Sequence, residues 1–286
     1  MTLAHGRYSL GGSPEQSIQQ HSSDFRCYSL EQARIHCQLL KHYNLDSLEW
    51  VFGPCIKQSD PLLNAGGRTD IRALINEFDI SVASVRASCL TISHHHITGR
   101  GRTDFQKILT DLIGQARAIG ANTIIVPLAD ASHQSLTEVS SFLSGLLEMP
   151  LAVARSVDVT VSIEADLPAR DFVTFAETIN HESFGICYNV ALAMKNQWPI
   201  KEDIQSLGQH LAAIRFGPST SYWGGHSGDV SQLSSSHFSE TLDEIGYKKT
   251  VYFPLEEAST STKDLPAELN LRRLIEKLRG KTHGDS

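Results

Sequence analysis

The sequence predicts a single-domain (β/α)8 barrel, the TIM-barrel form of the α/β class, and three observations favour it. Short β-branched runs alternate with amphipathic helical patterns along the whole chain. Several of these runs lack polar alternation, which is typical of strands buried on both faces of a parallel sheet. The chain of 286 residues has no evident linker, and its length is close to the ~250 residues of such barrels.

Seven clear β-rich segments and a weaker first one supply the strands that this barrel needs. An open, nucleotide-binding sheet would instead require a glycine-rich turn after a strand, and the Gly-Gly pairs at 11–12, 66–67 and 224–225 match neither G-x-G-x-x-G nor a P-loop. We therefore expect no nucleotide cofactor. The strands are expected at residues 2–5, 47–52, 80–90, 123–128, 158–164, 184–188, 212–216 and 250–255.

The helices between these strands are indicated by apolar stripes at helical spacing. Ser29 and Thr69 are suitable N-caps. A basic amphipathic helix at residues 269–279, within a segment at about 266–280, is expected to close the outer ring of one domain spanning residues 1–286. The other helices are expected at residues 30–43, 69–78, 104–119, 135–147, 169–179, 204–210 and 238–245.

Composition narrows the classes of protein that the chain can belong to. Hydrophobic residues make up 41% and charged residues 20%, as in globular rather than disordered proteins. The net charge of -7 weighs against general nucleic-acid binding, and no apolar run approaches the ~18–20 residues of a membrane helix. The odd number of scattered cysteines, 5, favours reduced thiols. We expect a cytoplasmic protein with neither a membrane nor a nucleic-acid partner.

Active sites of such barrels lie at the carboxyl ends of the strands, so polar residues at those ends are the candidates. Glu164 ends an apolar strand pattern and would face either the barrel mouth or solvent beside the turn at 167–168. Glu49 would be either buried against a cation or exposed. His94 and His96 could share one side of an extended chain as metal ligands, or the run at 94–96 could be an exposed polar loop.

Several short motifs, in order along nearly the whole chain, resemble those of the xylose isomerase-like TIM barrels, which include sugar-phosphate isomerases and epimerases. Residues 5–9 (HGRYS) resemble the family's segment after the first strand. Residues 45–50 (LDSLEW), which contain Glu49, and residues 162–167 (SIEADL), which contain Glu164, resemble the family's motifs at the second and fifth strands. Further likeness lies at Asn64, at residues 118–127 and at residues 246–247.

The resemblance implies a divalent cation (Mn, Mg, Co or Zn) at the strand ends. Its ligands would be a Glu, an Asp, a His and a Glu or Gln from strands five to eight, and the site would polarise a hydroxy-carbonyl substrate while carboxylates move a proton between adjacent carbons. Glu164 matches the first ligand. Asn189 stands at the Asp position, Arg215 at the His position and Pro254 at the last, with Glu256 two residues beyond.

An arginine stays protonated and cannot bind a metal, so Arg215 cannot be a ligand. Either other residues supply the missing ligands, or the site works without a metal. A rebuilt metal site would use Glu164, Asn189, His226 and Glu256. A metal-free site would use Glu164 as the base, while Arg215 pairs with it or holds a substrate carboxylate or phosphate. The candidate catalytic residues are thus Glu164, Arg215 and Glu256, and the expected substrate contacts are Arg7, Glu49, Trp50, Asn189 and His226. Trp50 could instead pack in the core or at the rim, and His226 could be only a loop residue.

The function implied by the resemblance is that of a sugar-phosphate isomerase or epimerase, or a lyase, of carbohydrate metabolism. Its substrate would be a small polyol, keto-sugar or hydroxy acid, and a homodimer is possible. The alternative is a non-catalytic barrel that binds a small ligand or a protein partner, which the missing Asp and His ligands favour.

The alignment of strands six and seven makes a direct prediction. The combined substitutions Asn189→Asp and Arg215→His should raise the affinity for Mn²⁺, because they restore an anionic and an imidazole ligand beside Glu164. Calorimetric titration of the double variant and the parent protein with Mn²⁺ measures this change. Unchanged affinity would show that the two positions are misaligned.

Overall fold

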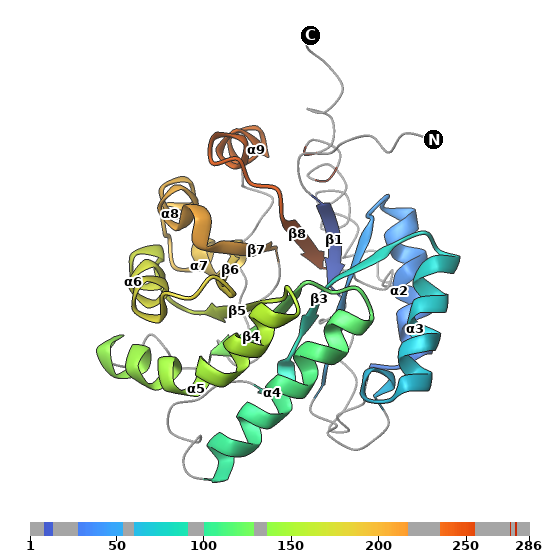
Figure 1. Ribbon diagram of the computed structural model, residues 1–286. Coiled ribbons are helices and arrows are strands. Elements are labelled where there is room, and N and C mark those ends of the chain that lie inside the picture. Colours follow the sequence, from blue (N-terminus) through green and yellow to red (C-terminus); the bar gives the residue numbers. More distant parts are fainter. Residues whose placement is uncertain are drawn as a thin grey trace.

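The computed structural model describes residues 9–13, 28–53, 60–90, 100–128, 136–216 and 235–254, together with Ile275 and Leu278. Within them, eight parallel strands close a barrel in sequence order, with β1 hydrogen-bonded to both β2 and β8 (Figure 1). The strands are β1 (Ser9–Ser13), β2 (Ser47–Val51), β3 (Ser81–Arg86), β4 (Thr123–Leu128), β5 (Thr160–Ala165), β6 (Phe184–Asn189), β7 (Leu211–Arg215) and β8 (Thr250–Pro254). The predicted fold class is confirmed.

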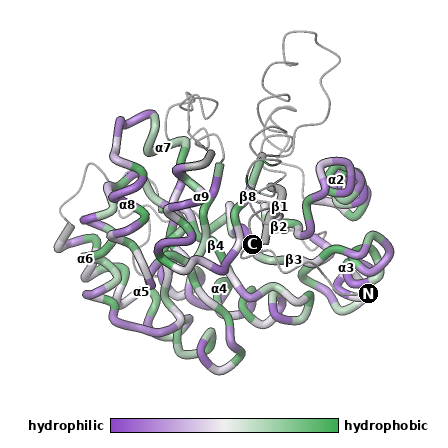
Figure 2. Tube along the Cα trace, turned by 90° about the horizontal axis from the view of Figure 1, so that it is seen from above, coloured by the Kyte–Doolittle hydropathy of each residue, from purple (hydrophilic) through white to green (hydrophobic). Residues whose placement is uncertain are grey.

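Helices surround the barrel and cover the outer face of its strands (Figure 1). Figure 2 shows hydrophobic segments toward the middle of the molecule and hydrophilic ones toward the outside of this ring. The helices are α2 (Leu30–His42), α3 (Ala65–Glu77), α4 (Arg100–Ala118), α5 (Leu136–Ser156), α6 (Ala169–Ile179), α7 (Val190–Lys195), α8 (Ile200–Leu207) and α9 (Ser235–Glu244), with 3-10 turns η1 (Pro61–Leu63), η2 (Ser88–Leu90) and η4 (Gly208–His210).

Most predicted elements are confirmed, and the differences have local causes. The first strand is Ser9–Ser13, whereas the predicted 2–5 lies outside the described residues; Gly11 and Gly12 weaken its β signal. Thr69 is not the cap of α3, because the Asn64 side chain accepts the Gly67 N–H and starts the helix earlier. Ser29 does cap α2, in a capping box with Gln32.

The end of the chain is described only in part. Ile275 and Leu278 are helical and buried, as expected for the helix predicted at 269–279. The rest of the segment at about 266–280 lies outside the described residues, so its closure of the ring remains a prediction.

Two irregularities shift the strand register inside the barrel. Between β2 and β3, Leu48 pairs with Val82 but Glu49 pairs with Ser84, so Ala83 is an extra residue. Between β6 and β7, Ile186 pairs with Leu211 but Cys187 pairs with Ala213, so Ala212 is extra. An extra residue reverses which side chains of a strand face the interior beyond it. Both shifts precede an arginine, Arg86 on β3 and Arg215 on β7.

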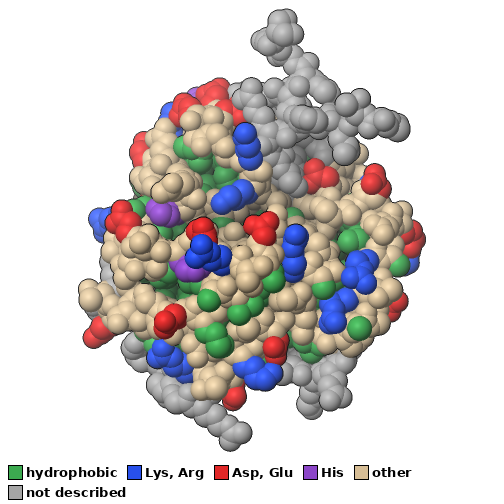
Figure 3. Space-filling model, in the orientation of Figure 1, with side chains coloured by type: hydrophobic (Ala, Val, Ile, Leu, Met, Phe, Trp, Pro, Cys, Tyr) green, Lys and Arg blue, Asp and Glu red, His purple; other side chains and the backbone are tan. Residues whose placement is uncertain are grey.

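The distribution of charge on the face shown in Figure 3 does not favour a nucleic acid or any other single class of partner. Basic and acidic side chains are interspersed over the face shown in Figure 3. No helix among the described residues is both long and apolar enough to span a membrane.

The first turn of α3 provides a test of the packing against η1. A Cβ atom at Gly67 would lie 2.2 Å from the backbone oxygen of Pro61, whereas one at Gly66 would meet only Asn64 Oδ1, at 3.5 Å. Gly67→Ala should therefore lower the free energy of unfolding by about 1–3 kcal/mol. The matched control Gly66→Ala should be neutral or stabilising by up to about 1 kcal/mol. Chemical denaturation measures both, and equal effects would refute this packing argument.

Candidate active site

Four charged side chains meet inside the barrel at the carboxyl half of its strands. Arg86 on β3 pairs with Glu164 on β5, and Arg215 on β7 pairs with Glu49 on β2. Neither pair joins neighbouring strands, so both contacts cross the interior. We call Glu49, Arg86, Glu164 and Arg215 the buried quartet.

The quartet is one connected network. Arg86 Nη1 donates to Glu164 Oε2, and Arg215 Nη2 donates to Glu49 Oε2. Arg215 Nε also lies 3.9 Å from Glu164 Oε2, so that this guanidinium bridges both carboxylates. The four side chains are at most 2% exposed. Their formal charges cancel, as burial requires, because an uncompensated charge in a protein interior is very costly.

Asn189 fixes the other oxygen of Glu164. Its Nδ2 donates to Glu164 Oε1 at 2.7 Å. Its Oδ1 accepts the backbone N–H groups of Ala191 (3.0 Å) and Leu192 (3.2 Å), which caps α7. The amide thus faces Glu164 with its donor and the helix with its oxygen.

The charge state of Glu164 follows from these contacts. Burial alone would raise the pKa of this carboxyl, but the charges of Arg86 and Arg215 and the hydrogen bonds from Arg86 and Asn189 outweigh burial and lower it. Glu164 is therefore ionised at neutral pH. A neighbouring thiol behaves oppositely, because burial raises the pKa of Cys187 well above its ordinary range and keeps it neutral.

An apolar layer lies beneath the quartet. It consists of Ile125, Cys187, Ala213 and Tyr252, with Ala83 packed against it. Ser84 links this layer to the quartet, since its Oγ donates to Glu49 Oε1 at 3.4 Å and its hydroxyl also contacts the Tyr252 phenol.

The described residues around Glu164 do not fit a divalent cation. Both carboxylate oxygens already accept hydrogen bonds, and two guanidinium groups lie beside them. The only metal-binding atom of Asn189, Oδ1, caps a helix instead. Within the described ranges, no three His, Cys, Asp or Glu side chains cluster as metal ligands do. His226 and Glu256 lie outside those ranges, so the rebuilt metal site remains a prediction.

The structure brings together Glu49, Glu164, Asn189 and Arg215 from the residues that the sequence singled out. Trp50 does not fit the predicted substrate contact, because it is fully buried beneath the helices and packs edge-on against Tyr28, with ring centroids 4.7 Å apart. Arg7, His226, Glu256 and the run at 94–96 lie outside the described residues.

Arg86 is the member of the quartet that the sequence did not reveal. It lies inside the strand predicted at 80–90, between Val85 and Ala87. A lone cation in an apolar strand was the available signal, since such a charge must find a buried partner.

Removing one carboxylate tests the charge balance. Glu164→Gln keeps the shape of the side chain but leaves two guanidiniums with one carboxylate, and it should lower the free energy of unfolding by about 3–5 kcal/mol. The matched control is Glu77→Gln, which breaks an exposed two-point pair with Arg34 and should cost at most about 1 kcal/mol. Denaturant unfolding of both variants checks this. Similar small losses would mean that the quartet is not a closed charge network.

Comparison with known proteins places this fold among solved barrels. No family model matches the sequence, and no curated protein matches it. A xylose isomerase-like TIM barrel protein from Mycobacterium smegmatis in complex with magnesium has a TM-score of 0.70 at 12% identity, over 99% of this chain and 100% of that one. A 3-keto-D-glucoside 4-epimerase from E. coli has a TM-score of 0.67 at 14% identity, over 96% and 99%.

A third similar structure is D-psicose 3-epimerase with D-tagatose from Clostridium cellulolyticum H10, with a TM-score of 0.65 at 13% identity, over 96% of this chain and 98% of that one. The coverage shows that the likeness extends over the whole barrel. At these identities the likeness concerns the fold. The chain thus has the fold of the xylose isomerase-like TIM barrels.

Proposed function

We propose that the protein catalyses proton transfer on a small polyol, keto-sugar or hydroxy acid, in the manner of a sugar isomerase or epimerase, without a bound metal. The observation that carries this proposal is the pair of guanidiniums beside Glu164 at the carboxyl ends of β3 and β7. Structurally similar proteins named as a 3-keto-D-glucoside 4-epimerase and a D-psicose 3-epimerase support the substrate class.

The two arginines can supply the electrostatic stabilisation that such a reaction needs. Arg86 and Arg215 together carry the same charge as one divalent cation. Guanidinium N–H groups are strong donors to an oxyanion. When a carbon beside a carbonyl loses its proton, negative charge develops on the carbonyl oxygen, and donors already fixed in a dry site stabilise that charge effectively.

Glu164 is the proposed base. Its lowered pKa keeps it ionised, and Asn189 holds one of its oxygens in place. The other oxygen contacts the guanidiniums, so a bound substrate must replace one of these contacts to present its proton. Glu49, held by the same Arg215, is a second carboxylate that could return a proton to the substrate. Two acid–base groups about one carbon are what an epimerisation requires.

A non-catalytic barrel is the second candidate, and one observation favours it. Glu49 and Glu164 are fully buried, and every described contact of Glu164 is with another side chain of the barrel. Such a network could serve only to stabilise the barrel, while a small ligand or protein partner binds elsewhere at its mouth.

The other expectations from the sequence are unchanged by the structure. A rebuilt metal site of Glu164, His226 and Glu256, a homodimer, a cytoplasmic location and the lack of a nucleotide cofactor remain predictions.

Proton exchange separates the metal-free enzyme, the enzyme with a rebuilt metal site and the non-catalytic barrel. The protein is incubated in D2O with D-tagatose, D-fructose and a 3-keto-glucoside, and deuterium uptake beside the carbonyl is followed by NMR. We expect uptake that persists in excess EDTA. Glu164→Gln should slow it by about 10²-fold or more, because general-base catalysis contributes on that order. Glu77→Gln, in the exposed pair, should leave the rate unchanged.

A second variant keeps this test valid if Glu164→Gln is poorly folded. Arg215→Lys retains the charge but loses the planar fork that bridges Glu49 and Glu164, and it should slow exchange while losing less stability than Glu164→Gln, because the charge balance is kept. Exchange that EDTA abolishes and Mn²⁺ restores would refute the metal-free site and support the rebuilt one. No exchange with any of these sugars would favour the non-catalytic barrel.

A further inference from the structure

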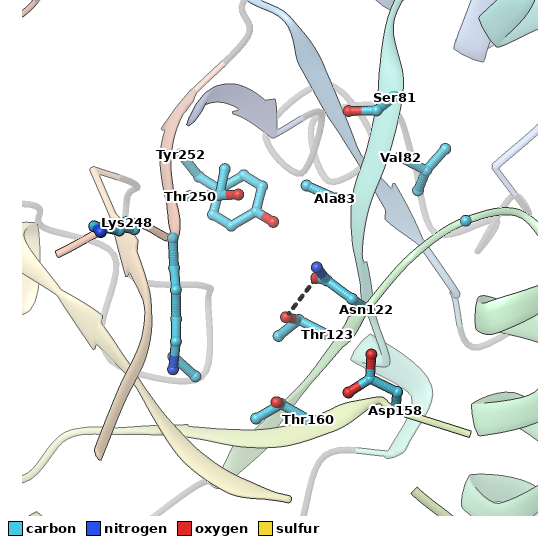
Figure 4. Close-up of a pocket in the computed structure, with 13 residues that line it drawn as sticks. Ser81, Val82, Ala83, Asn122, Thr123, Asp158, Thr160, Lys248, Thr250 and Tyr252 are labelled. Atoms are coloured by element: carbon cyan, nitrogen blue, oxygen red, sulfur yellow. Dashed lines mark hydrogen bonds between the residues drawn. The ribbon is translucent and has the colours of Figure 1, made fainter. Parts of the chain in front are cut away.

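A cavity lies at the opposite end of the barrel from the quartet. Its volume is about 440 Å³, within the usual size of small-molecule sites. It is formed where the strands begin, at Ser81 on β3, Thr123 on β4, Thr160 on β5 and Thr250 on β8 (Figure 4). We call it the floor cavity.

The floor cavity exists because this end of the barrel is built from small side chains. The interior of such barrels is ordinarily filled by layers of bulky branched residues. Here the wall includes Ala83 and Ala212, the extra residues of the two register shifts. Ala212 is accommodated only because its neighbour is Gly185, where a Cβ would lie 2.5 Å from that of Ala212.

The apolar layer separates the floor cavity from the quartet. Tyr252 belongs to both the layer and the cavity wall, and Ile125, Cys187 and Ala213 complete the layer. All four are at most 1% exposed. A molecule in the floor cavity would therefore be distinct from a substrate at Glu164.

The wall of the floor cavity is rich in groups that both donate and accept hydrogen bonds. Hydroxyls come from the first residues of four strands, and Asn122 adds an amide that accepts from Thr123 Oγ1 at 3.1 Å (Figure 4). Hydroxyls that rotate to suit a partner match a molecule which itself carries several hydroxyls. This lining indicates a polyol rather than an apolar ligand.

Charged residues at the rim favour an anionic group on that polyol. Lys248 and Lys249 precede β8, and Asp158 lies across the cavity from Lys248 (Figure 4). Together they carry one net positive charge. Desolvation by the surrounding wall lowers the pKa of the Lys249 ammonium, and an anion placed beside it would offset this cost.

We propose that the floor cavity is a second ligand site, which binds a small polyol with one anionic end, either a carboxylate or a phosphate. The site is independent of the reaction proposed at the quartet. The hydroxyl wall holds the polyol, and the two lysines hold the anionic end at the rim.

The test uses D-gluconate, D-glucose 6-phosphate and the neutral D-sorbitol as probes on isotope-labelled protein. Backbone amide NMR shifts should move in a saturable manner at Thr123, Thr160 and Lys249 with at least one anionic probe, and not at Glu164 or Asn189. The tighter of the two anions identifies the carboxylate or the phosphate as the anionic end. Sorbitol should bind at least tenfold more weakly, which corresponds to about 1.4 kcal/mol.

Two variants and one control localise the binding. Lys249→Met should weaken the anionic probe at least tenfold, and Thr160→Val, which removes one hydroxyl at constant shape, should weaken it severalfold. Lys107→Met, at an exposed lysine of α4 paired with Asp111, should have no effect. Shifts confined to Glu164 and Asn189, equal losses with Lys107→Met, equally tight sorbitol, or no saturable shift would each overturn the proposal. None of these outcomes depends on whether the quartet is catalytic.

Discussion

The cancellation of charge inside the barrel is the constraint on which the rest of this structure depends. Two guanidiniums buried in an apolar interior would be prohibitively costly alone, so each requires a carboxylate at bonding distance. Arg215 meets this need through Glu49, three strands away around the closed sheet, and Arg86 meets it through Glu164. The quartet therefore joins opposite sides of the barrel, and Asn189 extends it to the start of α7.

The same balance explains why the described side chains around Glu164 do not fit a cation, although the fold is that of solved barrels such as the one in complex with magnesium. A cation and two guanidiniums cannot share one carboxylate without strong repulsion. With Arg215 on β7, the neighbouring groups pair with one another. The Asn189 amide donates to Glu164 and caps α7, and Glu49 pairs with Arg215.

Strand positions were largely predictable because unbroken apolar runs between amphipathic stripes specify a parallel barrel. Glu164 was predictable because a carboxylate ends one of these runs. The inward direction of Arg86 was not, since the side that a strand residue faces depends on the extra Ala83, and an extra residue leaves no mark in the sequence pattern. The first strand was misplaced because its side-chain pattern is interrupted by Gly11 and Gly12. Of the two roles open to Trp50, the structure shows core packing, because its neighbour Glu49 takes the inward position.

The two extra alanines have a consequence for how this barrel can change. Side chains along a strand alternate between the interior and the helices. At Ala83 and at Ala212 this alternation reverses, so residues before and after each alanine follow opposite patterns. Arg86 and Arg215 owe their inward direction to that reversal. Loss of either alanine would therefore turn an arginine toward the helices and break the charge pairing of the quartet.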